Sequence, residues 1–233
     1  ATRHGNFAVK KGDKLAGTRI IPLVIEEEKM KTVKAQTMEL TGGKPILELK
    51  PFHHKNVGIV TTGNEVFHGR IQDTFTPVIV DKLSEFDTEV IDHVTWDDDD
   101  KKVTASILDM IEKGADIVIC TGGMSVDPDD KTPLAIKNTG ARIVSYGAPV
   151  LPGAMFLLAY YDRMARGKNR RTVIMGLPGC VMYAKRTIFD LVLPRVMADD
   201  EVTADELAAL GMGGLCLNCP TCTFPNCGFG KGY

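Results

Sequence analysis

The fold is decided by residues 115–130, which run Ala115-Asp116-Ile117-Val118-Ile119-Cys120-Thr121-Gly122-Gly123-Met124-Ser125-Val126-Asp127-Pro128-Asp129-Asp130. Every position from Ile117 to Cys120 is apolar, which is typical of a strand buried on both faces of a parallel sheet. Paired glycines, a serine and three carboxylates follow, where the carboxyl end of the strand is expected. Open α/β sheets bind their ligands at this edge. The stretch therefore predicts a buried parallel strand that leads into a binding loop.

Strands and helices alternate on both sides of this stretch. The expected strands cover residues 57–61, 88–94, 116–120, 141–146 and 172–176. The expected helices cover residues 76–86, 101–113, 132–139 and 183–197. Alternation in units of this length predicts an α/β fold with a mostly parallel, doubly wound sheet and helices on both faces.

Three segments are expected along the chain. Residues 1–55 form a small β-rich lead-in, with β-type pieces at 17–25 and 46–49 that are bounded by glycines and prolines. Residues 56–198 form the α/β domain, and residues 199–233 form an acidic helix and a Cys-rich tail. The first residue, Ala1, fits both removal of an initiator methionine and a piece of a longer protein.

The composition limits the classes of partner. Of the 233 residues, 44% are hydrophobic and 25% are charged, and the formal net charge of -2 excludes the basic surface typical of nucleic-acid-binding proteins. No apolar run reaches the roughly 18 residues of a membrane span, and the first residues lack the apolar core of a signal peptide. We expect a cytoplasmic protein that binds a small molecule, and neither nucleic acid nor membrane.

Four loops after expected strands have an unusual composition, namely residues 61–65, 96–100, 121–130 and 176–180. The loops are expected to meet, because the carboxyl ends of parallel strands share one edge. Glycines there let backbone N–H groups face an anion, and hydroxyls such as those of Thr62, Thr121 and Ser125 add donors. The nearby carboxylates suit such a site if a hard cation such as Mg²⁺ lies between them and the ligand. The four loops together predict a metal-bridged, phosphorylated ligand.

Each of these features also has a structural interpretation. Thr-Gly-Gly and Leu-Pro-Gly are common turns between strands and helices. Asp99 and Asp100 are interpreted as the cap and acidic first turn of the helix that begins near Lys101. Trp96, the single tryptophan, is expected to pack at the edge of the sheet, and Cys120 to be a small buried side chain.

Four ordered motifs carry a resemblance to a known family. They are Thr62-Gly63-Asn64-Glu65, similar to T-G-[DNS]-E; Gly69-Arg70-Ile71-Gln72-Asp73-Thr74, similar to G-x-I-x-D-[ST]-N; Gly122-Gly123-Met124-Ser125-Val126 with Asp130, similar to G-G-V-S-V-G-x-x-D; and Leu177-Pro178-Gly179, similar to the start of L-P-G-N-P. Together they resemble the molybdopterin-binding domain of molybdopterin molybdotransferases and adenylyltransferases, over roughly residues 57–196.

The resemblance implies a role in molybdenum cofactor biosynthesis. The family reaction is insertion of molybdate into adenylylated molybdopterin with Mg²⁺-assisted release of AMP, or the preceding adenylylation. By resemblance, Glu65 and Asp130 serve the metal and molybdate side, and Asp98 or Asp97 is a further carboxylate. The residues implied to bind the molybdopterin are Thr62, Gly63, Asn64, Asp73, Thr121, Gly122, Gly123, Ser125, Pro178 and Gly179. Family members commonly associate, so a homo-oligomer is expected.

The chain departs from the family pattern at specific positions. Phe75 replaces the Asn of D-[ST]-N, Asp127 replaces a Gly, and Cys180-Val181 replace Asn-Pro. The segment at residues 150–155 lacks both lysines of the family's K-P-G-K-P. Lysines supply point charges to a phosphate that glycine amides do not fully replace. We therefore expect altered ligand binding at a more acidic site.

The C-terminal tail carries the spacing C-x2-C-x2-C-x4-C at Cys216, Cys219, Cys222 and Cys227. In a reducing compartment, four thiols so close in sequence predict a metal site more often than two disulfides. The x2 intervals resemble iron–sulfur ligation, and four cysteines could equally close a tetrahedral zinc site. Iron–sulfur cluster, zinc and a metal-free tail remain open at this point.

Three functions are consistent with these observations. The first is a molybdotransferase-type enzyme that uses Mg²⁺. The second is a non-catalytic module that holds molybdopterin, or passes it to a molybdoenzyme or another protein of the cofactor pathway. The third is a nucleotide-pyrophosphate hydrolase domain, like that of competence-damage-inducible proteins, which share the fold.

Overall fold

A computed structural model describes residues 1–19, 21, 23–125, 127, 130–165 and 167–232. The chain divides into two compact units, Ala1–Pro51 and Phe52–Tyr233. The first unit contains helix α1 (Glu27–Leu40) and an isolated antiparallel bridge between Thr2 and Ala16. The second unit contains the sheet and all other helices.

The prediction of β-type pieces in the lead-in is wrong. The described residues of 17–25 and 46–49 lie in no strand, while Ile20 and Pro22 lie outside the described residues. Leu23 is 94% exposed and Ile46 is 70% exposed. A strand needs neighbouring strands and a face to bury, and these segments have neither in the first unit. Helix α1 was not expected from the sequence, because it has no buried residue and hence no apolar stripe.

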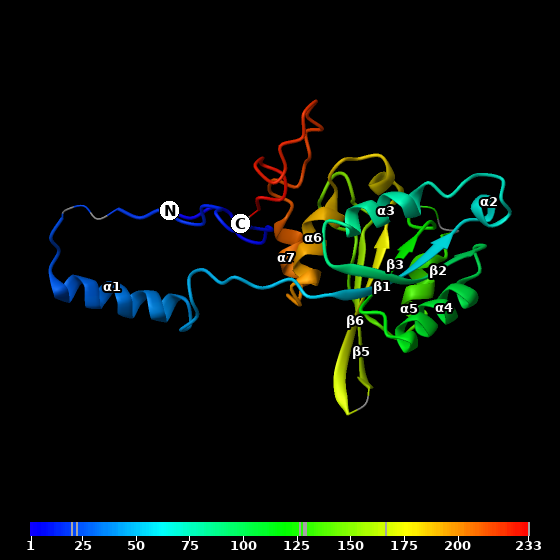
Figure 1. Ribbon diagram of the computed structural model, residues 1–233, viewed down its shortest axis with the longest axis horizontal. Coiled ribbons are helices and arrows are strands. Elements are labelled where there is room, and N and C mark those ends of the chain that lie inside the picture. The colour runs from blue at the N-terminus through cyan, green and yellow to red at the C-terminus, as the bar shows by residue number, and fades with distance from the viewer. Residues whose placement is uncertain (20, 22, 126, 128–129, 166, 233) are drawn as a thin grey trace. The chain divides into compact units, whose positions relative to one another are not determined.

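The second unit is built on a six-stranded sheet (Figure 1). The strand order is β2-β1-β3-β6-β5-β4. The strands are β1 (Lys55–Thr62), β2 (Thr88–Trp96), β3 (Ile117–Thr121), β4 (Arg142–Tyr146), β5 (Leu157–Ala165) and β6 (Lys168–Leu177). Strands β2, β1, β3 and β6 are parallel, whereas β5 runs antiparallel to both β6 and β4. The expected doubly wound, mostly parallel α/β fold is confirmed.

Helices cover both faces of the sheet. They are α2 (Asn64–Phe67), α3 (Phe75–Leu83), α4 (Asp100–Lys113), α5 (Thr132–Asn138), α6 (Ile188–Met197) and α7 (Ala204–Ala209), with the 3₁₀ turn η1 (Gly179–Met182). Val60 and Cys120 pack in one apolar cluster with Ile107 of α4 and Ile136 of α5. Because side chains alternate along a strand, the equally buried neighbours of Val60 and Cys120 face the opposite side.

A buried ion pair joins the helices α3 and α6. The ammonium group of Lys82 lies 2.7 Å and 3.0 Å from the two carboxylate oxygens of Asp190. Only 9% and 3% of the two side chains are exposed. Asp190 also accepts hydrogen bonds from the backbone N–H of Thr187 and from Arg186. One carboxylate thus caps α6 and holds it to α3.

The C-terminal tail is packed against the second unit. Leu215 forms a parallel bridge with Leu151, and the N–H of Gly230 donates to the carbonyl of Gly213. Phe229 is buried, and Lys231 donates to the carbonyl of Pro225 at 2.7 Å. Backbone and side-chain hydrogen bonds therefore fix the conformation of the tail. None of the helices in the described ranges is long and apolar enough to cross a membrane.

Candidate ligand site at the carboxyl edge of the sheet

The carboxyl ends of the parallel strands are aligned at one edge. Thr62 at the end of β1 pairs with Trp96, and Thr61 pairs with Thr121 of β3. Thr121 in turn pairs with Leu177, where β6 ends. The four loops expected to converge therefore leave the sheet side by side.

The glycine turn after β3 is fixed by close packing. Gly122 and Gly123 have φ values of +80° and +52°, which side chains rarely adopt. A Cβ on Gly122 would lie 2.0 Å from the carbonyl oxygen of Thr62. The Thr62 hydroxyl lies 3.1 Å from that of Thr132, which donates to the carbonyl of Gly122. Buried threonines thus hold the turn in one conformation.

The remainder of this loop is closed by Asp130. Its carboxylate accepts a hydrogen bond from the backbone N–H of Ser125, and the Tyr146 hydroxyl donates to the carbonyl of Ser125 at 3.1 Å. Burial, and secondarily the charge of Asp130, raise the pKa of Tyr146, which keeps it a donor. Val126, Pro128 and Asp129 lie outside the described residues.

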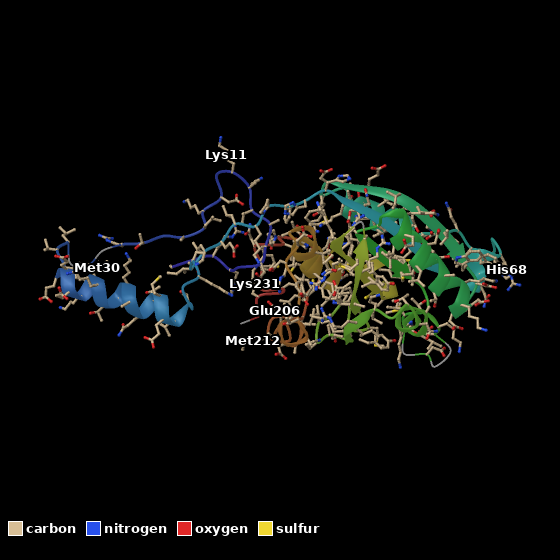
Figure 2. All side chains as sticks on the ribbon, turned by 90° about the horizontal axis from the view of Figure 1, so that it is seen from below. Lys11, Met30, His68, Glu206, Met212 and Lys231 are labelled. Carbon is tan, nitrogen blue, oxygen red and sulfur yellow. The ribbon has the colours of Figure 1, made fainter. Side chains whose placement is uncertain are left out.

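The loops after β1 and β2 contact each other. The side-chain amide of Asn64 donates to Asp98 at 2.8 Å, and the N–H of Gly63 donates to the carbonyl of Trp96. Glu65 is exposed at the start of α2. His68, which follows α2, bonds to the carbonyl of Asn64 and projects away from the sheet (Figure 2).

The structural interpretation of the acidic run after β2 is confirmed. Asp99 is the cap of α4 and accepts from the N–H groups of Lys101 and Lys102, and Asp100 lies in the first turn. Asp97 pairs with the ammonium group of Lys102 at 3.1 Å. Trp96 donates to Ser106 at 2.7 Å and packs on the apolar cluster under α4, as expected.

Asp73 lies at the start of α3, on the opposite face from Thr132. Its Oδ1 accepts from the N–H groups of Phe75 and Thr76, while its buried Oδ2 has no hydrogen-bond partner among the described residues and lies 3.8 Å from the His93 ring. Burial alone would raise the pKa of Asp73, but the hydrogen bonds from Thr76 and Phe75 prevail and lower it. Asp73 therefore stabilises α3 as a carboxylate.

This assignment predicts a loss of stability in acid. A lowered carboxyl pKa stabilises the fold above the ordinary Asp pKa, and the stabilisation disappears as the pH falls through and below that value. Asp73→Asn keeps an acceptor for the helix and removes the charge. We expect it to cost about 1 kcal/mol near neutral pH, because the amide oxygen still accepts at the start of α3 and only the charge is lost. The free energy of unfolding in urea, measured at several acid pH values, should then fall less steeply with decreasing pH in Asp73→Asn than in the wild type. The same pH dependence in both proteins would contradict the assignment.

A cavity of about 590 Å³ opens beside the glycine turn. It is lined by Met124, Ser125, Leu151, Pro152, Gly153, Ala154, Met155, Pro178, Gly179, Cys180, Leu215 and Cys216. These residues come from the loop after β3, the segment before β5, the loop after β6 and the tail. No lysine or arginine is among the described residues that line the cavity. Its wall is chiefly apolar.

The predicted site residues at this edge divide into three groups. Ser125, Pro178 and Gly179 line the cavity, and Thr62, Thr121, Gly122 and Gly123 build the turn behind it. Glu65, Gly63, Asn64 and Asp98 lie at the same edge but outside its lining. Within the described part of the chain, no group of three or more His, Cys, Asp or Glu residues could hold a metal ion. The structure therefore gives no preformed site for Mg²⁺.

Some contributors were missed by the sequence analysis. Thr132 and Tyr146 fix the glycine turn through side-chain hydrogen bonds, and Leu151, Pro152 and Met155 supply the apolar wall of the cavity. Thr132 could have been found as a hydroxyl residue that starts a helix after the site loop. The contribution of Tyr146 depends on the position of β4, which the sequence does not specify.

Comparison with known proteins decides the family. A model of the family described as "Probable molybdopterin binding domain" matches residues 58–198. The chain belongs to this family. The matched range contains all four loops and the glycine turn. It agrees with the range of roughly residues 57–196 over which the sequence resembles this family.

Curated relatives of this molybdopterin-binding domain come from different proteins. A CinA-like protein of Mycobacterium tuberculosis is 37% identical over 75 residues, which are 32% of this chain and 17% of that protein. A molybdopterin adenylyltransferase of Pyrococcus furiosus is 27% identical over 135 residues, or 55% of this chain and 79% of that protein. A molybdopterin molybdenumtransferase of Haemophilus influenzae is 27% identical over 197 residues, or 81% of this chain and 43% of that protein. The chain thus spans only part of the first and third relatives.

The departures from the family pattern have local structural reasons in this molybdopterin-binding domain. Phe75, at the position of the family's Asn, is buried at the start of α3. Val181, in place of Pro, is fully buried in η1. Leu151 and Ala154, in the segment that lacks the lysines, line the cavity. Apolar side chains thus stand where the family pattern has an amide, a proline or lysines.

Proposed function

We propose that this chain binds molybdopterin in the cavity between the Met124–Ser125 and Pro178–Cys180 segments. The observation that carries the proposal is a cavity of about 590 Å³ at the carboxyl ends of β3 and β6 in a member of the molybdopterin-binding family. Small-molecule pockets usually have volumes of about 300–1,000 Å³. The apolar wall suits the ring system of a pterin, and the domain that binds it is taken as residues 56–198.

Binding is tested directly on the whole chain. Anaerobically purified protein is analysed for retained pterin and then titrated with molybdopterin and with AMP in separate calorimetric experiments. We expect saturable binding of molybdopterin at one site per chain. Binding of AMP alone, with hydrolysis of ADP-ribose, would favour the nucleotide-pyrophosphate hydrolase instead.

The lining of the cavity favours a role as a molybdopterin carrier over a catalytic role. The described lining residues include no lysine or arginine that could meet developing charge on a phosphate. A chiefly apolar wall can hold the pterin without converting it. Transfer would then follow contact with a molybdoenzyme or another protein of the cofactor pathway, and a homo-oligomer is part of the same proposal.

Mg²⁺-dependent insertion of molybdate is the second candidate, and the position of Asp130 favours it. Asp130 lies on the loop that contributes Ser125 to the cavity, and Glu65 and Asp98 lie along the same edge. Mg²⁺ is usually held by one or two carboxylates together with phosphates of the substrate. The carboxylates therefore need not form a complete site before the ligand binds. When bound, the ion would neutralise phosphate charge as AMP leaves.

The two candidates predict different results for Asp130→Asn. The amide oxygen of Asn can still accept the hydrogen bond from Ser125, so the loop should keep its conformation while the charge is lost. If the chain inserts molybdate, AMP release from adenylylated molybdopterin should fall on the order of 100-fold, with binding retained. If the chain is a carrier, the wild type itself should bind tightly and release no AMP. The assay is quantification of AMP with molybdate and Mg²⁺ present.

A further inference from the structure

A second cavity collects almost all the thiols of the chain. It has a volume of about 510 Å³, and Cys180, Cys216, Cys219, Cys222 and Cys227 are among its lining residues. The chain has 6 cysteines, and the remaining one, Cys120, is buried in the core. All are free thiols. Cys180 lies in η1, far from the tail in sequence, so the cavity is formed by tertiary packing.

The loop that carries the cysteines is held in place on both sides. Lys185 donates to the carbonyl of Pro220 at 3.1 Å, and the guanidinium of Arg186 lies 5.1 Å from the centre of the Phe224 ring. Arg186 is itself bonded to Asp190, the buried carboxylate of α6. The tail cysteines are thus presented by a loop that is anchored to the core of the second unit.

The cavity and the cysteine spacing favour a cluster over a single zinc ion. With Zn–S bonds of about 2.3 Å and tetrahedral geometry, thiolates around one ion lie about 3.8 Å apart. Among the described residues, no three Cys, His, Asp or Glu side chains are already gathered to hold a metal ion, so the thiols would close around whatever they bind. In an iron–sulfur cluster each thiolate binds a different iron or shares an iron with one other, so the ligands surround an inorganic core. Thiols that line a cavity of about 510 Å³ leave room for such a core.

We infer that Cys216, Cys219, Cys222 and Cys227 bind an iron–sulfur cluster in this cavity. The C-x2-C-x2-C spacing is the one that wraps three thiolates around such a core. Each thiol releases its proton to solvent as its bond to iron forms, and iron and sulfide are supplied from outside the protein. Lys185 lines the same cavity and places a positive charge near the thiolate ligands.

The cluster site adjoins the proposed molybdopterin site. Pro152, Cys180, Leu215 and Cys216 line both cavities. Leu215 and Cys216 are also tied to Leu151 by backbone pairing, including a bond of 2.7 Å from the N–H of Cys216. Occupation of the tail by a cluster would therefore set the position of one wall of the ligand cavity. The cluster proposal itself does not depend on what that cavity binds.

The test is anaerobic reconstitution of the whole chain with Fe²⁺ and sulfide, and separately with Zn²⁺. We expect bound iron and acid-labile sulfide in comparable amounts, with a visible charge-transfer band. Cys219→Ser and Cys222→Ser change exposed side chains and should lose the band and most of the iron, with an unchanged circular dichroism spectrum. Binding of zinc alone, or of no metal, would overturn the proposal.

Cys180→Ala is the matched control, because Cys180 lines the same cavity outside the tail motif. This variant should retain the iron and sulfide content of the wild type. Retention of the cluster in Cys219→Ser together with its loss in Cys180→Ala would overturn the assignment of ligands. Because the experiment measures metal content, its result does not depend on whether the chain binds molybdopterin.

Discussion

Gly122→Ala is expected to destabilise the domain and abolish binding at the loop edge. At φ +80° the left-handed conformation alone costs a non-glycine residue about 1–3 kcal/mol. The new Cβ would also lie 2.0 Å from the carbonyl oxygen of Thr62, which is backbone and cannot move without displacing the end of β1. The free energy of unfolding in urea and the affinity for molybdopterin measure the two effects.

Gly140→Ala is the matched control for this prediction. Gly140 has φ +83°, and a Cβ there would meet no atom within 4 Å. The control therefore carries the same conformational cost of about 1–3 kcal/mol without the collision. We expect Gly122→Ala to lose clearly more stability than Gly140→Ala, and to lose binding that Gly140→Ala retains. Equal losses for the two variants would contradict the close packing of the glycine turn against β1.

Asp190→Ala is expected to lower the free energy of unfolding by about 3–5 kcal/mol, the usual cost of leaving one partner of a buried ion pair alone. The substitution leaves the ammonium group of Lys82 buried beside α6 and removes the acceptor for the N–H of Thr187. It also removes one of the two carboxylates that pair with Arg186, the other being Glu85. Chemical denaturation followed by circular dichroism gives the value.

A double variant separates the buried charge from simple loss of packing. Lys82→Met with Asp190→Leu replaces both charges by apolar side chains of comparable size, which is often neutral or stabilising. We expect it to recover most of the stability lost in Asp190→Ala. A double variant as unstable as the single one would show that the capping bond to Thr187 carries the effect. A loss below about 1 kcal/mol in the single variant would contradict burial of the pair.

The parallel core of the fold could be predicted because its signal is local. Strand β3 is buried at all its positions, and its apolar run followed by two glycines marks both the strand and its end. Strand β5 could not be found in this way. Its first four residues are apolar and buried, but the strand continues through Asp162 and Arg163, where half-buried and exposed positions alternate, so the apolar run does not mark where the strand ends.

The start of α6 was also predicted too early, near residue 183. The segment before it is the turn η1 and an irregular stretch, and the helix begins only after Thr187, whose side chain forms a capping box with Asp190. A capping box is visible in sequence as a hydroxyl followed three residues later by an acidic residue. The apolar pattern extends through Val181 and Tyr183 and obscured it.

The loops of the candidate site were predictable, and the cavity was not. Four glycine-containing or acidic loops at strand ends follow from the strand pattern, and the alignment of Thr62, Trp96 and Thr121 brings them together. The cavity is lined in part by Leu151–Met155 and by Leu215. These distant segments are brought together by backbone pairing between Leu151 and Leu215. Such pairing leaves no periodic signal in the sequence.

Gly179→Leu tests the central claim that the cavity beside the glycine turn binds molybdopterin. Gly179 lines the cavity and is exposed, and a Cβ there would meet only the Met182 methyl group, at 3.9 Å. A leucine side chain can therefore occupy ligand space without strain. Ala105→Leu, on an exposed position of α4, adds the same side chain elsewhere. Anaerobic calorimetric titration with molybdopterin should show binding to the wild type and Ala105→Leu, and none to folded Gly179→Leu. Undiminished affinity of Gly179→Leu would contradict the account.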